Sequence, residues 1–170
     1  MTLVVLFTSC SVDRIDEDNS IILDELNMKA IEENGSCAST NIVNIKGDYR
    51  GTCEAFIDYY KEVLVIKFTT VDYKIRTSGL FIGPMSESPI AKPGIVELGK
   101  FKFYESFKDG VYETRYKFRL VDIENNSYLI AKLKLSNDFG IENAWAQGTQ
   151  VPGDDGAMFV EGFIGGCFKN

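Results

Sequence analysis

Two stretches of this chain alternate mainly apolar and polar side chains with a period of two residues. In residues 112–120, Tyr, Thr, Tyr, Phe and Leu alternate with the charged residues Glu, Arg, Lys and Arg. In residues 129–136, Leu, Ala, Leu and Leu take every second position, and Lys132 and Lys134 lie between them. Because successive side chains of a β-strand point to opposite faces, this spacing predicts strands with one packed face and one face in water.

Shorter strand-like stretches lie at residues 62–70, 73–82 and 101–103, and the alternation of residues 62–70 places Leu, Ile and Phe on one face. Turn-forming pairs such as Gly83-Pro84 and Pro152-Gly153 separate the stretches. Short strands at this spacing, without helices between them, predict an all-β domain. We expect an antiparallel β-sandwich, either jelly-roll or Ig-like.

The N-terminus carries a different signal. Residues 3–7 are apolar, and the small residues Thr8 and Ser9 directly precede Cys10. This resembles a bacterial lipoprotein signal, in which the cysteine is lipidated and becomes the mature N-terminus. The resemblance implies a signal peptide at residues 1–9, without its usual basic leader, and a lipid anchor that binds a membrane. The alternative is a buried N-terminal strand with a free core cysteine.

An acidic segment follows the cysteine. Residues 11–34 carry eight acidic and two basic side chains, which is −6 of the net charge of −7. We therefore expect a hydrated tether over residues 10–40 and a nearly neutral domain over residues 41–170. Within the tether, Ile22, Leu26 and Ile31 form only a weak helical stripe. Acidic residues after a lipidated cysteine resemble the export signals of surface lipoproteins in the Bacteroidota, which implies the outer face of the outer membrane.

The composition excludes several classes of chemistry. The chain contains no histidine, so Ser-His-Asp and Cys-His catalysis and His-ligated zinc are excluded. Basic residues form no cluster, so we expect no nucleic-acid partner. No two cysteines lie two to four residues apart, as a zinc site would need. We expect no cofactor and no catalytic residues.

Three cysteines remain after Cys10: Cys37, Cys53 and Cys167. In an oxidising compartment, two of the three are expected to pair and one to stay free. We expect a disulfide from Cys167, in the last strand, to either Cys37 or Cys53, because spacing alone does not fix the connectivity. Three buried or reduced thiols are the alternative.

Several motifs resemble a family of secreted β-sandwich domains from uncharacterised envelope proteins of the Bacteroidota. The resemblance covers residues 45–168 and includes the strand-like segments 46–52, 63–70 and 77–83. It also includes the Gly-x-Phe segment 99–101 and the Ala-Trp-Ala-x-Gly motif at residues 144–148. The tryptophan that the family usually carries near Tyr73 is missing here. The family has no established activity, so the resemblance implies a fold and a compartment.

Three residues are candidate ligand contacts. Trp145, the only tryptophan, has small neighbours and is expected in the core; exposed beside Tyr73 or the pair Tyr59-Tyr60, it would instead be a sugar-stacking platform. Asp154 and Asp155 offer hard oxygen ligands for Ca²⁺, but the sequence around them is also that of a tight turn.

These observations predict a non-catalytic lipoprotein of the bacterial cell envelope. Its role is expected to be binding, adhesion or membership of an envelope complex, with an extracellular protein or glycan as partner. The alternative is a carbohydrate-binding protein or a carbohydrate-active enzyme with paired carboxylates. A concave pocket with clustered acids and an exposed aromatic ring favours the alternative, and a buried Trp145 favours the interaction module.

Overall fold

The computed structural model describes residues 29–33, 35–92, 95–96, 98–124, 127–153 and 156–168. A helical turn at residues 29–33 precedes the strands. The strands are β1 (Ala38–Asn44), β2 (Tyr49–Asp58), β3 (Val63–Thr70), β4 (Lys74–Gly83), β5 (Ile90–Lys92), β6 (Ile95–Val96), β7 (Phe103–Val111), β8 (Glu113–Arg119), β9 (Tyr128–Asn137), β10 (Gly140–Ala146), β11 (Thr149–Gln150) and β12 (Met158–Glu161). Four 3₁₀ helices are η1 (Met85–Glu87), η2 (Leu98–Lys100), η3 (Leu120–Asp122) and η4 (Phe163–Phe168).

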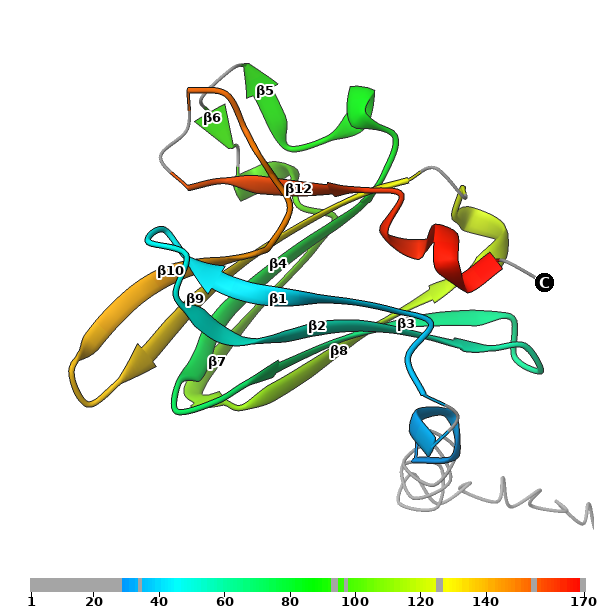
Figure 1. The fold of residues 1–170 in the computed structure, drawn as a ribbon, viewed down its shortest axis with the longest axis horizontal. Helices are drawn as coiled ribbons and strands as arrows, with labels where there is room; N and C mark the ends of the chain where they lie inside the picture. Colours follow the sequence, from blue (N-terminus) through cyan, green and yellow to red (C-terminus); the bar gives the residue numbers. More distant parts are fainter. Residues whose placement is uncertain are drawn as a thin grey trace, which may run out of the picture.

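The main sheet follows one hydrogen-bonded path, shown in Figure 1: β8-β3-β2-β1-β10-β9-β4-β7. Near its start, β9 also pairs with β12, which pairs with β11. Every pairing between described strands is antiparallel, so the predicted all-β, antiparallel class is confirmed. The path is nearly closed and barrel-like, and the finer expectation of a jelly-roll or Ig-like sandwich stays a prediction.

Aromatic side chains bridge the two edge strands of this path, β7 and β8. The ring of Phe103 on β7 lies 4.7 Å from that of Phe118 and 6.0 Å from that of Tyr116, both on β8. The Tyr116 hydroxyl donates to the Ser78 carbonyl at 3.2 Å, and burial raises the pKa of Tyr116 to about 12. Ring packing therefore closes the gap where the described strands share no backbone ladder.

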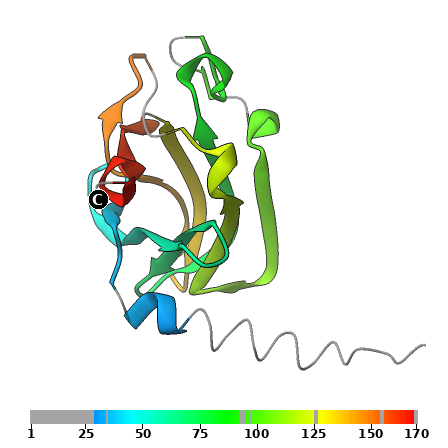
Figure 2. The same ribbon diagram turned by 90° about the vertical axis from the view of Figure 1, so that its right-hand side faces the viewer.

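The interior of the barrel is filled by the apolar positions of the alternating strands. Leu64, Ile66 and Phe68 of β3 are fully buried there, as their spacing predicts, and so are Leu133 and Leu135 of β9. One end is covered by η4, whose Phe163, Ile164 and Cys167 are buried. Figure 2 shows η4 beside the start of β1.

The structure corrects three details of the strand predictions. Residues 101–103 were expected to be a short strand, but Phe101 is buried on the outer face of the sheet and β7 runs from Phe103 to Val111. The last aromatic segment was expected to be a strand that contains Cys167, but that residue lies in η4. β1 begins at Ala38, inside the range 10–40 assigned to the tether.

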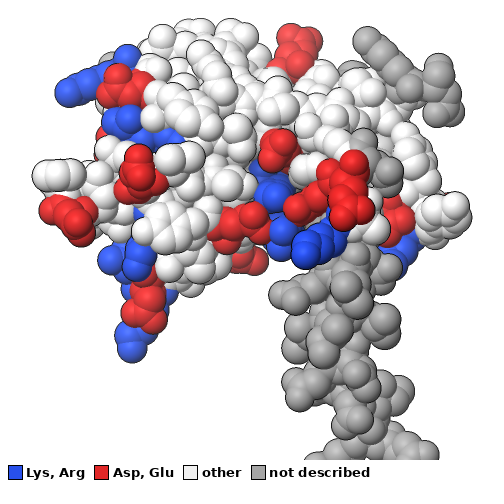
Figure 3. All heavy atoms as spheres, turned by 60° about the horizontal axis from the view of Figure 1, so that its bottom comes forward, with Lys and Arg blue, Asp and Glu red and all other residues white. Residues whose placement is uncertain are grey.

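The helical turn at residues 29–33 packs on the outer face of β2 and β3. Ile31 packs against buried Phe56 and Val65. Glu32 forms ion pairs with Lys67 on β3 at 3.0 Å and with Arg115 on β8 at 2.8 Å. Figure 3 shows acidic and basic residues intermixed on the face of the molecule that it presents. The turn is therefore held by an apolar contact and by opposite charges.

Replacing Glu32 with Gln is expected to loosen this turn and to cost up to about 1 kcal/mol of unfolding free energy. Partial burial acts to raise the pKa of Glu32, but hydrogen bonds and attraction from Lys67 and Arg115 outweigh it, so the pKa is lowered. The ion pairs therefore stabilise the fold above the ordinary carboxyl pKa, and this stabilisation is lost as the pH falls through the lowered value.

Urea unfolding at a series of pH values tests this expectation. The difference in unfolding free energy between the natural chain and Glu32→Gln should be largest near neutral pH and should vanish in acid. Glu33→Gln is the matched control, since Glu33 is exposed and should show no such difference. A Glu32→Gln difference that does not change with pH would contradict the ion-pair explanation.

No helix in the described ranges is long and apolar enough to cross a membrane.

Candidate functional site

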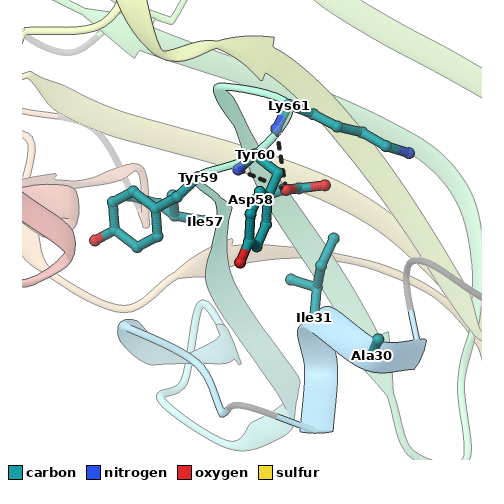
Figure 4. Close-up of a pocket in the computed structure, with 7 residues that line it drawn as sticks. All are labelled: Ala30, Ile31, Ile57, Asp58, Tyr59, Tyr60 and Lys61. Atoms are coloured by element: carbon teal, nitrogen blue, oxygen red, sulfur yellow. Dashed lines mark hydrogen bonds between the residues drawn. The ribbon is translucent and has the colours of Figure 1, made fainter.

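A pocket of about 350 Å³ lies between the helical turn and the β2–β3 connection, and we call it the tyrosine pocket. It is lined by Ala30, Ile31, Ile57, Asp58, Tyr59, Tyr60 and Lys61. Figure 4 shows Tyr60 and Asp58 on one side of the pocket and Ile31 on the helical turn facing them. Tyr60 is fully exposed and Tyr59 is 63% exposed. The pocket thus has an aliphatic floor and an aromatic rim.

The β2–β3 connection is ordered by Asp58. Its Oδ1 accepts hydrogen bonds from the backbone N–H groups of Tyr60 and Lys61, both at 3.1 Å. This is the turn geometry that an aspartate side chain favours, because it satisfies backbone donors that the strands leave unpaired. The turn ends at Glu62, which adopts a positive φ of 53°. Asp58 therefore fixes the backbone from which both tyrosines project.

Tyr59 is held by the disulfide-bonded end of the barrel. Its hydroxyl donates to the backbone carbonyl of Cys167 at 3.0 Å. Cys167 is disulfide-bonded to Cys37, just before β1, and Cys53 is a buried free thiol. This confirms a bridge from Cys167, resolves its partner as Cys37, and excludes the three-thiol alternative. The pairing depends on η4 folding back onto the start of β1, which spacing in the sequence does not reveal.

The tyrosine pocket presents aliphatic and aromatic side chains and one carboxylate. Asp58 is its only carboxylate among the described residues, and both hydrogen bonds that it accepts come from backbone N–H groups. Glycoside hydrolysis ordinarily uses two carboxyl groups on either side of the scissile bond. Tyrosines, in contrast, are enriched at binding surfaces, whose fully buried centre is apolar.

Trp145 is a core residue, as its small neighbours predict. Its side chain is only 5% exposed and packs on the outer face of the sheet with Phe81, Phe101 and Ile130. The sugar-stacking alternative requires an exposed ring. Tyr73 is also engaged elsewhere, because the Arg50 guanidinium lies 4.7 Å from its ring centroid.

The Ala-Trp-Ala-x-Gly motif has a steric explanation in this structure. Ala144 and Ala146 point into the barrel and are fully buried, whereas Trp145 points outward between them. A Cβ atom at Gly148 would lie 2.2 Å from the carbonyl oxygen of Phe159, so only glycine fits there. Gly148 therefore serves a close approach of two backbone segments, and the two alanines are buried in the core.

Three sequence-predicted site residues, Cys10, Asp154 and Asp155, lie outside the described residues. Within the described ranges, no three His, Cys, Asp or Glu side chains gather closely enough to hold a metal ion. Glu142, which lies near Asp154 and Asp155 in the sequence, forms an ion pair with Arg50 instead. Partial burial opposes ionisation of Glu142, but hydrogen bonds from Arg50 and Asn44 lower its pKa overall. The negative charge of Glu142 is therefore balanced by Arg50 within the fold.

A second hollow, of about 330 Å³, lies on the outer face of β4, β7, β9 and β10, and we call it the lysine hollow. It is lined by Thr77, Gly79, Tyr104, Lys132, Lys134 and Asn143. In the sequence, the two lysines are marked only as polar positions of a strand, and Tyr104 belongs to no motif. No local motif marks the hollow, because its residues come together only through strand pairing.

Comparison of the chain with protein-family models, with curated proteins and with solved structures gave no match.

Proposed function

We propose that this chain is a non-catalytic binding lipoprotein of a bacterial cell envelope. In this proposal Cys10 is lipidated, the acidic segment is the tether, and the domain faces the exterior from the outer membrane. The tyrosine pocket contacts a partner protein. The hydrogen bond from Tyr59 to Cys167 carries the proposal, because it ties one of two neighbouring exposed tyrosines to a disulfide-bonded end of the barrel.

The chemistry of the tyrosine pocket supports a protein partner. Tyrosine is enriched at protein interfaces because it buries a large ring while its hydroxyl still finds a hydrogen-bond partner. The aliphatic floor formed by Ile31 and Ile57 suits an apolar side chain of the partner. Asp58 and the fixed turn supply preorganisation, which lowers the entropy lost on binding.

The disulfide supports the proposed compartment. Disulfides persist in oxidising environments such as the bacterial periplasm and the cell surface, and they are rare in the cytosol. The Cys37–Cys167 bridge is therefore the bond expected of an exported domain. The resemblance of residues 45–168 to secreted β-sandwich domains of the Bacteroidota points to the same compartment.

The mass of the mature N-terminus tests the lipid anchor. With a basic leader added ahead of Met1 and expression in a bacterial host, we expect a chain that begins at an acylated Cys10. The Cys10→Ala variant should lack this modification and leave the membrane fraction. An unprocessed chain with a free Cys10 thiol would contradict the proposal and would favour the buried-strand alternative.

Replacement of Tyr60 with Ala tests the contact site. The fully exposed side chain makes this change neutral for folding, within about 0.5 kcal/mol. A photo-crosslinking amino acid at position 60 of the lipidated chain identifies the envelope protein that lies against the pocket. We then expect Tyr60→Ala to weaken binding of that protein at least about tenfold. Tyr49→Ala, at the other end of β2 and 51% exposed, is the matched control; equal affinity of both variants would contradict the proposal.

Carbohydrate binding is a second candidate function, favoured by the lysine hollow. Tyr104 is 52% exposed there, and the amide of Asn143 and the hydroxyl of Thr77 line the same hollow. An exposed ring with nearby neutral hydrogen-bonding groups suits a sugar, which has an apolar C–H face and a rim of hydroxyls.

A further inference from the structure

We propose that the lysine hollow binds an acidic sugar, a pyranose that carries a carboxylate or a sulfate group. The inference rests on the carbohydrate-binding candidate and names its ligand class, and it does not depend on the tyrosine pocket. Four observations carry it: the strand register, two cations without acidic partners, the neutral groups around them, and the size of the hollow.

Strand register brings the lining residues together in two adjacent rows across the sheet. In one row, Gly79 on β4 pairs with Tyr104 on β7 and with Lys132 on β9. In the next row, Lys134 on β9 pairs with Thr77 on β4 and with Asn143 on β10. Lys132 and Lys134 are two residues apart on one strand, so both project from the same face. The arrangement is therefore built on paired strands and not on loops.

Both lysines lack an acidic partner. Neither forms an ion pair with any residue that the structure describes, and no described Asp or Glu lines the hollow. On β3 of the same sheet, by contrast, Lys67 pairs with Glu32 and Glu113. Two neighbouring ammonium groups without carboxylates attract an anion.

One of the two cations is held in place by the core. The Nζ of Lys132 lies 5.0 Å from the ring centre of Trp145, a buried residue that pairs with Lys132 across β9 and β10. Such a cation–π contact restrains a flexible side chain and leaves the ammonium group available to a ligand. Lys134 is exposed, so it adds a second charge-assisted donor at the surface.

The neutral residues distinguish a sugar from an anion held by charge alone. Tyr104 supplies an exposed ring for the C–H face of a pyranose, and Thr77 and Asn143 supply hydrogen bonds for its hydroxyls. The volume of about 330 Å³ lies at the lower end of the range for small-molecule sites. Nucleic acids are bound through larger sets of basic side chains than these two lysines.

The fluorescence of Trp145 provides a direct readout, because it is the only tryptophan and it contacts Lys132. The full chain with Cys10→Ala, which cannot be lipidated, is titrated at about 0.15 M salt. The probes are tetragalacturonate, which carries only carboxylates, a κ-carrageenan tetrasaccharide, which carries only sulfates, neutral galactotetraose and tripolyphosphate. We expect at least one of the two acidic oligosaccharides to change the fluorescence and to bind at least about tenfold more tightly than the other two probes. The acidic oligosaccharide that binds more tightly identifies the preferred acidic group as carboxylate or sulfate.

Lys134→Gln and Tyr104→Ala should each weaken that binding about tenfold. Lys46→Gln and Tyr49→Ala, which remove an exposed lysine and an exposed tyrosine outside the hollow, should bind as the natural chain does. Thermal unfolding of each variant verifies that the fold is retained. Equal binding of galactotetraose would overturn the acidic ligand and leave carbohydrate binding standing. Equal binding of tripolyphosphate, unchanged binding by both hollow variants, or no binding of either acidic oligosaccharide would overturn the site.

Discussion

Replacing Trp145 with Ala is expected to lower the free energy of unfolding by about 3–5 kcal/mol. The ring is the largest side chain of the outer cluster, where it packs with Phe81, Phe101 and Ile130. Its removal leaves a cavity, because these neighbours are fixed by strand pairing and by the β11–β12 segment above them. The contact between Lys132 and the ring is lost as well, which adds about 0.5–1 kcal/mol.

Urea unfolding followed by far-UV circular dichroism measures this loss without a tryptophan signal. Trp145→Phe is the informative companion, because a smaller ring fills part of the site and should cost less than Ala. Tyr60→Ala removes an exposed aromatic ring and should leave the stability unchanged within about 0.5 kcal/mol. A Trp145→Ala cost similar to that of Tyr60→Ala would contradict the assignment of Trp145 to the core.

Replacing Cys37 and Cys167 together with Ser is expected to cost about 2–5 kcal/mol. The bridge joins residues that are 130 positions apart, so its loss releases nearly the whole described chain in the unfolded state. It also frees η4, which covers one end of the barrel and holds Tyr59 through the Cys167 carbonyl. The double variant is therefore expected to lose both stability and the fixed position of Tyr59.

Denaturation with and without a reducing agent separates the bridge from the substitutions. The natural chain, once reduced, should unfold at the urea concentration of the double variant, and the double variant should not respond to reduction. In the folded chain, burial raises the pKa of the Cys53 thiol and keeps the reactive thiolate scarce. Equal stability of the oxidised and reduced natural chain would contradict a structural role for the bridge.

The strands with one solvent-exposed face were predictable, because the alternation of apolar and polar residues that marks them is local. Leu64, Ile66 and Phe68 alternate with residues of the other face, and the structure buries all three inside the barrel. β10, in contrast, carries buried Trp145 between buried Ala144 and Ala146, so its sequence shows no alternation. A strand that is packed on both faces shows no alternation of apolar and polar residues in its sequence.

The candidate sites were less predictable, because contacts between distant residues make them. The sequence marks Tyr59 and Tyr60 only as companions of an exposed Trp145, and the structure places them instead beside Cys167 and the helical turn. The lysine hollow joins residues of β4, β7, β9 and β10 that are adjacent only through strand register. No spacing along the chain encodes such a neighbourhood.

The sequence by itself determined the all-β, antiparallel class, the inward faces of β3 and β9, and the burial of Trp145. Each of these follows from side-chain size and polarity at neighbouring positions, which act within a few residues. Only the tertiary structure decided that the sheet nearly closes on itself, that Cys37 is the partner of Cys167, and which polar residues share a hollow. These features depend on which strands pair and how far the sheet coils, and both are set by packing summed over the whole chain.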